Sequence, residues 1–230
     1  YVVIKFARWA FEKFKGVEDK LGTQMRAVGE VMSIGKNYKE AFQKAIRSLE
    51  TGRYGLGHVK NFDRLSKEEL LKDFHDKTKD ELLAMLVEPT SERQFIMYEA
   101  LRKGATVEEL YNLTKIKHYF IEQMKELVEE EEEILKHKGE MISDEQLTAA
   151  KKDGFSDKYL SQLLEIPEEE IRNHRISLGV EEAWEGVHVS GTKDSAYYYS
   201  TYNAKDKNPV SEAKPKIMIL GGGPNRIGQG

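Results

Sequence analysis

The sequence lacks several features that mark common classes of protein. It contains no cysteine, which excludes disulfide bonds and thiolate metal sites and is compatible with a reducing compartment. It has no basic excess, because 36 Lys and Arg residues face 40 Asp and Glu residues. A dedicated nucleic-acid binder needs a cationic patch to neutralise phosphates. No apolar run approaches the roughly 18 residues of a membrane-spanning helix. We therefore expect neither nucleic acid nor a membrane as partner.

The composition indicates a soluble protein with an adequate core. Charged residues make up 33% and hydrophobic residues 39% of the 230 positions, which is enough for one large or two small domains. The first residues, Tyr1 to Ile4, have the character of a strand interior, and the last residues lie in a glycine-rich stretch. We expect the chain to be a piece of a longer protein.

Short strands are predicted near both ends. Residues 1–6 (YVVIKF) and 216–220 (KIMIL) combine β-branched and apolar side chains. Residues 197–202 form an extended aromatic stretch, and residues 203–215 are polar and proline-containing, as is typical of a linker.

The segment after the first strand contains many glycines. Residues 25–35 are apolar, but Gly29 makes a helix there unfavourable. Residues 38–49 place Phe42, Ala45, Ile46 and Leu49 on one helical face. Gly52, Gly55 and Gly57 then predict a flexible exit.

From Ser66 to about Ser177 the sequence predicts helices. Pro167 suits a first helical position, and the acidic residues 168–170 complement the helix dipole. Three earlier helix starts fit the capping box, in which a hydroxyl and a longer side chain satisfy backbone amides. These pairs are Ser66 with Glu69, Thr106 with Glu109, and Ser143 with Gln146.

The longest predicted helix runs from about Lys115 to His137 and stops at Gly139. Its predicted apolar face comprises Ile116, Phe120, Met124, Leu127, Val128, Ile134 and Leu135. Consecutive helical carboxylates diverge instead of converging on a cation. We therefore interpret residues 129–133 as a solvated face, supported by pairs such as Glu132 with Lys136.

A weak internal repeat lies within the helical region. Gly104, Leu110, Leu113 and Ile116 recur as Gly154, Leu160, Leu163 and Ile166, at a constant offset of 50 positions. Each copy predicts a short helix, a tight turn and a second helix. A DNA-binding helix-turn-helix is rejected, because residues 168–170 would repel phosphates where a recognition helix begins.

The residues that could carry chemistry are few. The six histidines (58, 75, 118, 137, 174 and 188) show no metal-ligand spacing, and no catalytic triad is readable. Gly221, Gly222 and Gly223 follow a predicted strand, so they could approach a phosphate or simply form a tight turn of an α/β sheet. Glu30 stands in an apolar stretch and needs either a partner or a wet cavity.

Several segments together resemble one family. TQMRAVGEVMSIGK (residues 23–36), followed by AFQKAIRSLE, resembles the end of the first ATP-grasp unit of the carbamoyl-phosphate synthetase large subunit. KPKIMILGGGPNRIGQG (residues 214–230) resembles the opening of its second half, and SAYYYSTY resembles the stretch leading into that half.

The resemblance implies a cytoplasmic ligase. Such an enzyme makes carbamoyl phosphate from bicarbonate, glutamine-derived ammonia and two ATP, for arginine and pyrimidine synthesis. It uses ATP with Mg or Mn, and a glutaminase subunit or domain supplies the ammonia. The family's metal ligands and phosphate-binding arginines would lie outside Tyr1–Gly230, so the resemblance implies no catalytic, cofactor-binding or metal-binding residue here, and an inactive isolated piece.

The resemblance also implies a division of the chain. Residues 1–52 would end the first ATP-grasp unit, 53–202 would form the helical oligomerisation domain, 203–215 a linker, and 216–230 the start of the second half. Met25 and Glu30 match positions that line the family's carbamate tunnel. Lys36 stands where the family often has Arg, and a lysine keeps the positive charge but loses the bidentate geometry.

These observations predict a mainly α fold, with a helical oligomerisation domain flanked by short β-containing pieces of neighbouring α/β domains. Its function would be self-association and connection of the two synthetic halves. Two alternatives stand beside this hypothesis. One is an autonomous helical interaction module without an enzyme. The other is a nucleotide-binding enzyme that uses the glycines at 221–223.

Overall fold

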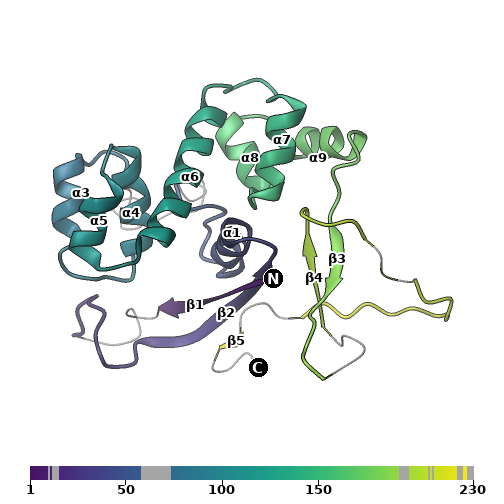
Figure 1. Ribbon diagram of the computed structural model, residues 1–230, viewed down its shortest axis with the longest axis horizontal. Coiled ribbons are helices and arrows are strands. Elements are labelled where there is room, and N and C mark those ends of the chain that lie inside the picture. Colours follow the sequence, from purple (N-terminus) through teal and green to yellow (C-terminus); the bar gives the residue numbers. More distant parts are fainter. Residues whose placement is uncertain are drawn as a thin grey trace.

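The structure is a computed structural model that describes residues 1–9, 11, 16–57, 74–191, 197–206, 208, 210–221 and 225–226. A helical body lies against a small N-terminal sheet, and a second small sheet follows it (Figure 1). The mainly α fold with short strands is confirmed.

The N-terminal sheet is built from β1 (Val2–Trp9) and β2 (Ala27–Gly35), which pair antiparallel, and β5 (Asn225–Arg226) adds to the other edge of β2. The strand predicted at residues 1–6 is confirmed. The apolar stretch at 25–35 is also a strand, and alternate residues from Val31 to Gly35 are buried while Glu30 and Met32 are exposed.

Helix α1 (Tyr38–Ser48) covers the buried face of this sheet (Figure 1). Asn37 caps the helix by accepting a hydrogen bond from the Glu40 N–H. The predicted apolar face is confirmed, because all four of its residues are buried: Phe42, Ala45, Ile46 and Leu49. Ala41, which was not predicted, is buried as well. A small residue is needed where α1 meets β2, because a Cβ on Gly35 would lie 2.9 Å from the Ala41 nitrogen.

The helical body contains α3 (Lys79–Met85), α4 (Arg93–Arg102), α5 (Val107–Thr114), α6 (His118–Leu135), α7 (Asp144–Lys152), α8 (Asp157–Leu164) and α9 (Glu168–Ser177). The capping boxes at Thr106 and Ser143 are confirmed, and Thr78 forms a further one with Glu81. The predicted pair of Ser66 and Glu69 lies outside the described residues. Pro167 occupies the N-cap, one position before the predicted one.

The internal repeat is confirmed, and it extends over three helices. We call α4–α6 the first triplet and α7–α9 the second triplet. Helix α5 spans 107–114 and α8 spans 157–164, so both bounds differ by 50. Gly104 and Gly154 share positive φ values of 89° and 96°, and Lys115 and Glu165 end the two short helices in the left-handed region. Both triplets therefore have a glycine with positive φ before the short helix and a left-handed residue at its end.

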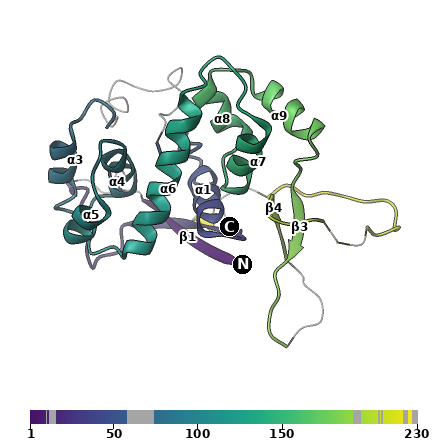
Figure 2. The same cartoon turned by 45° about the horizontal axis from the view of Figure 1, so that its top comes forward.

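Helix α6 lies between α3–α5 on one side and α7–α9 on the other (Figure 2). It begins at His118 rather than Lys115, because the left-handed backbone of Lys115 terminates α5. Its buried face runs through Ile121, Met124, Leu127, Val128, Glu131 and Ile134. Phe120, predicted to be buried, is 42% exposed. Its ring packs against Tyr38 of α1, with ring centroids 5.3 Å apart.

The C-terminal region departs from the prediction at residues 216–220. β3 (Ala183–Gly186) and β4 (Tyr198–Thr201) form an antiparallel hairpin, which confirms the extended aromatic stretch. Residues 216–220 are not a strand, and Ile217 to Leu220 are 83–88% exposed. A strand needs a neighbour for its ladder of hydrogen bonds, and no strand pairs with this segment within the described part of the chain.

The two triplets provide matched positions for a stability test. Leu163 is completely buried, whereas the equivalent Leu113 is 38% exposed. We expect Leu163→Ala to lower the free energy of unfolding by about 2–5 kcal/mol, because it leaves a core cavity. Leu113→Ala should cost less than half as much. Urea unfolding followed by circular dichroism measures both, and equal losses would contradict the burial difference.

Candidate functional site

Glu131 is the clearest correction to the sequence interpretation. It belongs to the acidic run predicted to form a solvated helix face, yet its exposure is 0%. The neighbours Glu129, Glu132 and Glu133 are exposed as predicted. A helix turns by 100° per residue, so one member of a five-residue run can face the core while others face water. The predicted pair of Glu132 with Lys136 is wrong, since Lys136 pairs with Glu133 and Glu132 pairs with Arg102.

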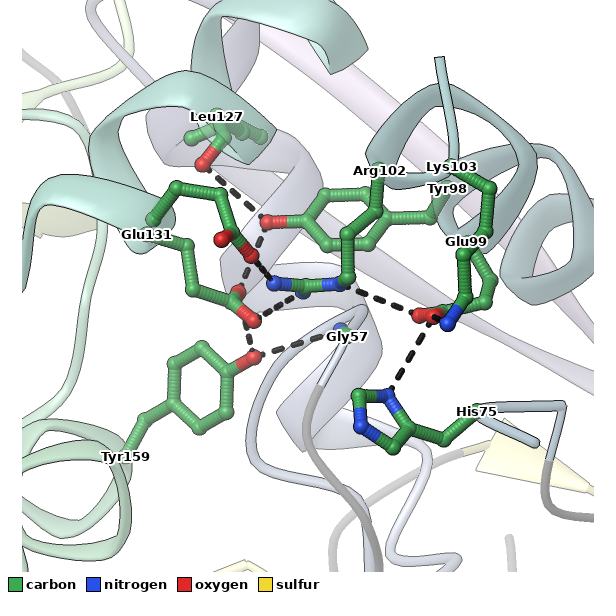
Figure 3. A network of polar contacts seen from close by, with 10 residues as sticks. Gly57, His75, Tyr98, Glu99, Arg102, Lys103, Leu127, Glu131 and Tyr159 are labelled. Atoms are coloured by element: carbon green, nitrogen blue, oxygen red, sulfur yellow. Dashed lines mark hydrogen bonds and ion pairs between the residues drawn. The ribbon is translucent and has the colours of Figure 1, made fainter. Parts of the chain in front are cut away.

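The Glu131 carboxylate lies at the centre of a polar network between three helices (Figure 3). Tyr98 on α4 and Tyr159 on α8 direct their hydroxyls at Oε2, at 2.7 Å and 2.6 Å. Arg102 on α4 donates to Oε1. We call these four residues the Glu131 network. Because it joins α4, α6 and α8, it locks the first triplet to the second.

Further acidic residues surround the Arg102 guanidinium. Its Nε donates to Glu99 Oε2 at 3.1 Å, and another nitrogen contacts Glu132. His75 Nδ1 lies 3.3 Å from the second oxygen of Glu99 (Figure 3). Burial lowers the pKa of Arg102, but Glu131, Tyr98 and Glu99 raise it by more, so the net shift is upward. Burial and the Glu131 charge raise the pKa of Tyr98 well above its usual value. Arg102 therefore stays charged and Tyr98 neutral.

The glycine segment predicted to be a flexible exit is instead packed against the Glu131 network. The Gly57 N–H donates to the Tyr159 hydroxyl at 3.2 Å, and Leu56 is 2% exposed. A Cβ on Gly57 would collide with Arg102, Tyr98 and Glu131, and a Cβ on Gly55 would collide with the Tyr159 ring. These glycines permit close approach of the backbone. The spacing of these glycines can be read from the sequence, but the Glu131 network that they approach cannot.

A second buried ionic cluster lies within the second triplet. Lys151 on α7 contacts Asp157 Oδ1 at 2.6 Å, and Arg175 on α9 donates to Oδ2 at 2.8 Å. The ring of Tyr202 lies 4.7 Å from the Lys151 ammonium. Burial lowers the pKa of Lys151 to about 8, although Asp157 opposes the shift. Sequence analysis missed this cluster, because the three charges belong to three separate helices.

Helix α1 joins the N-terminal sheet to the second triplet. The amide of Asn203 donates to Glu40 Oε2 at 3.2 Å and to the Lys152 carbonyl at 2.7 Å. Lys39 lies 2.5 Å from Asp153 and 3.0 Å from Glu126 on α6. A side chain on Gly154 would collide with the α1 backbone at Glu40. The sheet, α1 and the second triplet are therefore held as neighbours.

Glu130 on α6 faces the same junction. Burial, and then the nearby Asp153 carboxylate, raise the pKa of Glu130 to about 8, while Lys39 opposes the shift. Glu130 is therefore largely protonated near neutral pH and forms a side-chain hydrogen bond with Asp153. This proton relieves part of the repulsion among the carboxylates around Lys39.

The residues that the resemblance assigned to a tunnel lie outside the helical body. Met25 is 79% exposed and lines a cavity of about 360 Å³ with Trp9 and residues 21–27. Glu30 is on the exposed face of β2 and pairs with Lys5 at 2.5 Å. Of the two predicted surroundings, a charged partner or a wet cavity, the described structure shows the partner. The tunnel role of both residues stays a prediction.

The remaining predicted positions are dispersed. Gly221 is exposed, and a Cβ added there would meet no described atom within 4 Å beyond its chain neighbours. Gly222 and Gly223 lie outside the described residues. Lys36 contacts the carboxylate of Glu185 on β3, which also accepts a hydrogen bond from Tyr199 at 3.0 Å. The positive charge of Lys36 is therefore paired with a carboxylate of the same chain.

Among the described residues, no group of three or more His, Asp or Glu side chains is arranged to hold a metal ion. His118 and His174 each pair with one carboxylate, Glu108 at 2.9 Å and Asp144 at 2.8 Å. Of the helices in the described ranges, none combines the length and apolarity needed to cross a bilayer.

The repeated helices and the polar contacts that lock them together define an α-helical scaffold domain. Residues 30–179 match the family described as "Carbamoyl-phosphate synthetase large chain, oligomerisation domain". Because this match covers more than half of the 230 residues, the chain belongs to that family. The predicted domain boundaries at 52, 202 and 215 stay a prediction.

Named relatives agree with this assignment. The chain is 42% identical to the carbamoyl phosphate synthase large chain of Nostoc sp. and 44% identical to that of Archaeoglobus fulgidus. It is 41% identical to the chloroplastic arginine-specific large chain of Arabidopsis thaliana. Each alignment includes 100% of this chain but only 19–21% of the relative. The chain therefore spans about a fifth of the length of these curated relatives.

The Glu131 network predicts an asymmetry within the acidic run. We expect Glu131→Gln to lower the free energy of unfolding by about 3 kcal/mol, because the buried Arg102 loses a charged partner. Glu129→Gln, two residues away on the exposed side, should change it by less than about 0.5 kcal/mol. Urea denaturation at pH 7 measures both, and similar small effects would show that the network contributes little.

Glu130 predicts a pH dependence of stability. Its folded-state pKa of about 8 lies above the ordinary 4.5, so the folded state binds the proton more tightly than the unfolded state. Its contribution is complete below pH 4.5 and is lost as the pH rises toward 8. Glu130→Gln should remove this loss and be about 2 kcal/mol more stable than the parent at pH 8.5, but not at pH 4.5.

Unfolding curves at both pH values measure this difference. Glu129→Gln is the matched control, since it removes one exposed carboxylate from the same helix. A parallel pH profile for the parent and Glu130→Gln would contradict the assignment.

Proposed function

We propose that this chain is the assembly and connecting segment of a carbamoyl-phosphate synthetase large chain. The observation that carries the proposal is the family match over residues 30–179, which coincides with α1 and the two locked triplets. The complete protein would make carbamoyl phosphate from bicarbonate, glutamine-derived ammonia and two ATP. It would supply arginine and pyrimidine synthesis in the cytoplasm, with a glutaminase subunit or domain as partner.

A rigid spacer suits this role. The Glu131 network fixes the triplets to each other, and the contacts of α1 fix the N-terminal sheet to the second triplet. A segment that connects two synthetic halves and presents helices to another subunit must keep its faces in a constant relation. Buried charged groups with satisfied partners favour one arrangement over others.

The N-terminal sheet and the C-terminal segment would then belong to the neighbouring units. Met25 and Glu30 would contribute to the wall of a carbamate tunnel, supported by their exposure beside β2. Gly221 to Gly223 would open the second half. ATP and its Mg or Mn ions would bind to residues of the complete protein outside this chain, which by itself would be inactive.

Light scattering on the purified 230-residue chain tests the assembly role. We expect a dimer or larger species of the 26.5 kDa chain at micromolar concentration, dissociating on dilution. A concentration-independent monomer would remove self-association from this segment. The same sample should release no phosphate from ATP with magnesium, and measurable ATP hydrolysis would contradict the proposed division of labour.

A further inference from the structure

Lys44 on α1 has neutral partners where a partly buried lysine commonly has a carboxylate. Its side-chain nitrogen donates to the Ile34 carbonyl oxygen of β2 at 2.5 Å and to the Ser200 carbonyl oxygen of β4 at 2.7 Å. The side chain is partly buried where these three elements meet. The ion pairs formed within the described part of the chain do not include Lys44.

Two neighbouring lysines provide the contrast. Lys39, five residues earlier on α1, lies 2.5 Å from Asp153 and 3.0 Å from Glu126. Lys151 on α7 lies 2.6 Å from Asp157. A carboxylate stabilises the ammonium form, whereas a carbonyl oxygen also accepts a hydrogen bond from a neutral amine. The partners of Lys44 therefore favour the charged form less than those of Lys39 and Lys151 do.

The two carbonyl acceptors match the hydrogen-bonding capacity of a neutral lysine amine. An ammonium carries three N–H groups, whereas an amine carries two and a lone pair. When both N–H groups of Lys44 are donated to Ile34 and Ser200, the lone pair is left for nucleophilic attack. Burial lowers the pKa of Lys44 to about 8, while Glu40 opposes the shift and Arg47 adds to it. About a tenth of the molecules then carry the amine at pH 7, against fewer than about one in a thousand for an ordinary lysine.

We propose that Lys44 is a carbamoylation site, which takes a carbamoyl group from carbamoyl phosphate or from the cyanate that this compound releases. The choice of donor rests on the proposed function, whereas the nucleophile does not. With carbamoyl phosphate, the amine nitrogen attacks the carbonyl carbon, the bond from that carbon to the phosphate oxygen breaks, and the amine proton leaves with the phosphate. With cyanate, the nitrogen adds to the carbon of isocyanic acid and the amine proton moves to the isocyanic nitrogen. Both routes leave the same uncharged urea on Lys44, and neither needs an oxidant or a reductant.

Labelling of the 230-residue chain with potassium cyanate, followed by digestion and peptide mass spectrometry, tests the site. The label on Lys44 is divided by the label on Lys117, an exposed lysine at the start of α6, so that the ionisation of the reagent cancels. We expect this ratio to exceed about five at pH 7 and to fall at least about tenfold between pH 7 and pH 10. The amine fraction of Lys44 saturates above its pKa of about 8, whereas that of an ordinary exposed lysine keeps rising. A ratio of one or less at pH 7, or a ratio that does not change with pH, would overturn the proposal.

Two controls separate the surroundings of Lys44 from burial and from local sequence. Lys39 lies on the same helix and is also partly buried, but its ammonium is paired with two carboxylates, so it should be labelled less than Lys117 at pH 7. Stronger labelling of Lys39 than of Lys44 would contradict the role of the neutral partners. In concentrated urea the ratios for both lysines should approach one, and a Lys44 ratio that persists there would assign its reactivity to the neighbouring sequence instead of the folded structure.

Fresh carbamoyl phosphate in place of cyanate distinguishes the two donors. Labelling of Lys44 faster than the measured cyanate accounts for would identify direct transfer from carbamoyl phosphate, and labelling equal to that amount would identify cyanate. Both outcomes support the site, whereas the absence of label on Lys44 with either reagent overturns it. The readout is independent of oligomeric state and of ATP hydrolysis, so the carbamoylation site can fail while the proposed function stands, and the reverse.

Discussion

The burial of the Glu131 carboxylate is the constraint on which the arrangement of the helical body depends. An ionised carboxylate with no exposure to water is tolerated only when donors surround it. Tyr98, Tyr159 and Arg102 provide those donors from two other helices, so α4, α6 and α8 cannot move apart without uncovering a charge. The backbone at Gly57 packs directly against these buried groups, so a side chain at this position would collide with them.

The two triplets use the same turns but different cores. Their glycines and left-handed helix ends recur at an offset of 50, which gives the same helix–turn–helix path twice. The polar groups do not follow the repeat. The first triplet contributes Arg102 to the Glu131 network, whereas the second triplet keeps its own buried cluster around Asp157. Local backbone chemistry thus sets the repeated shape, and the charged groups make each copy distinct.

Helix α1 gives the helical body a defined relation to the N-terminal sheet. It covers β2 with small residues and meets the second triplet at Gly154, where a Cβ would collide with the α1 backbone. The family match begins at residue 30, inside β2, and therefore includes α1 together with the helical body. In the described part of the chain, β1 lies at the margin of the sheet and residues 217–220 are exposed.

The sequence alone determined the features that depend on neighbouring residues. Capping boxes at Thr106 and Ser143, the α1 face and the offset repeat follow from local hydrogen bonding and periodicity, and all are confirmed. The tertiary structure decided which charges are buried and which strands form. Glu131 is buried because its donors come from residues 98, 102 and 159, and residues 216–220 lack a strand because no partner strand is present in the described part of the chain. Both outcomes depend on residues distant in sequence, so neither can be predicted from a local pattern.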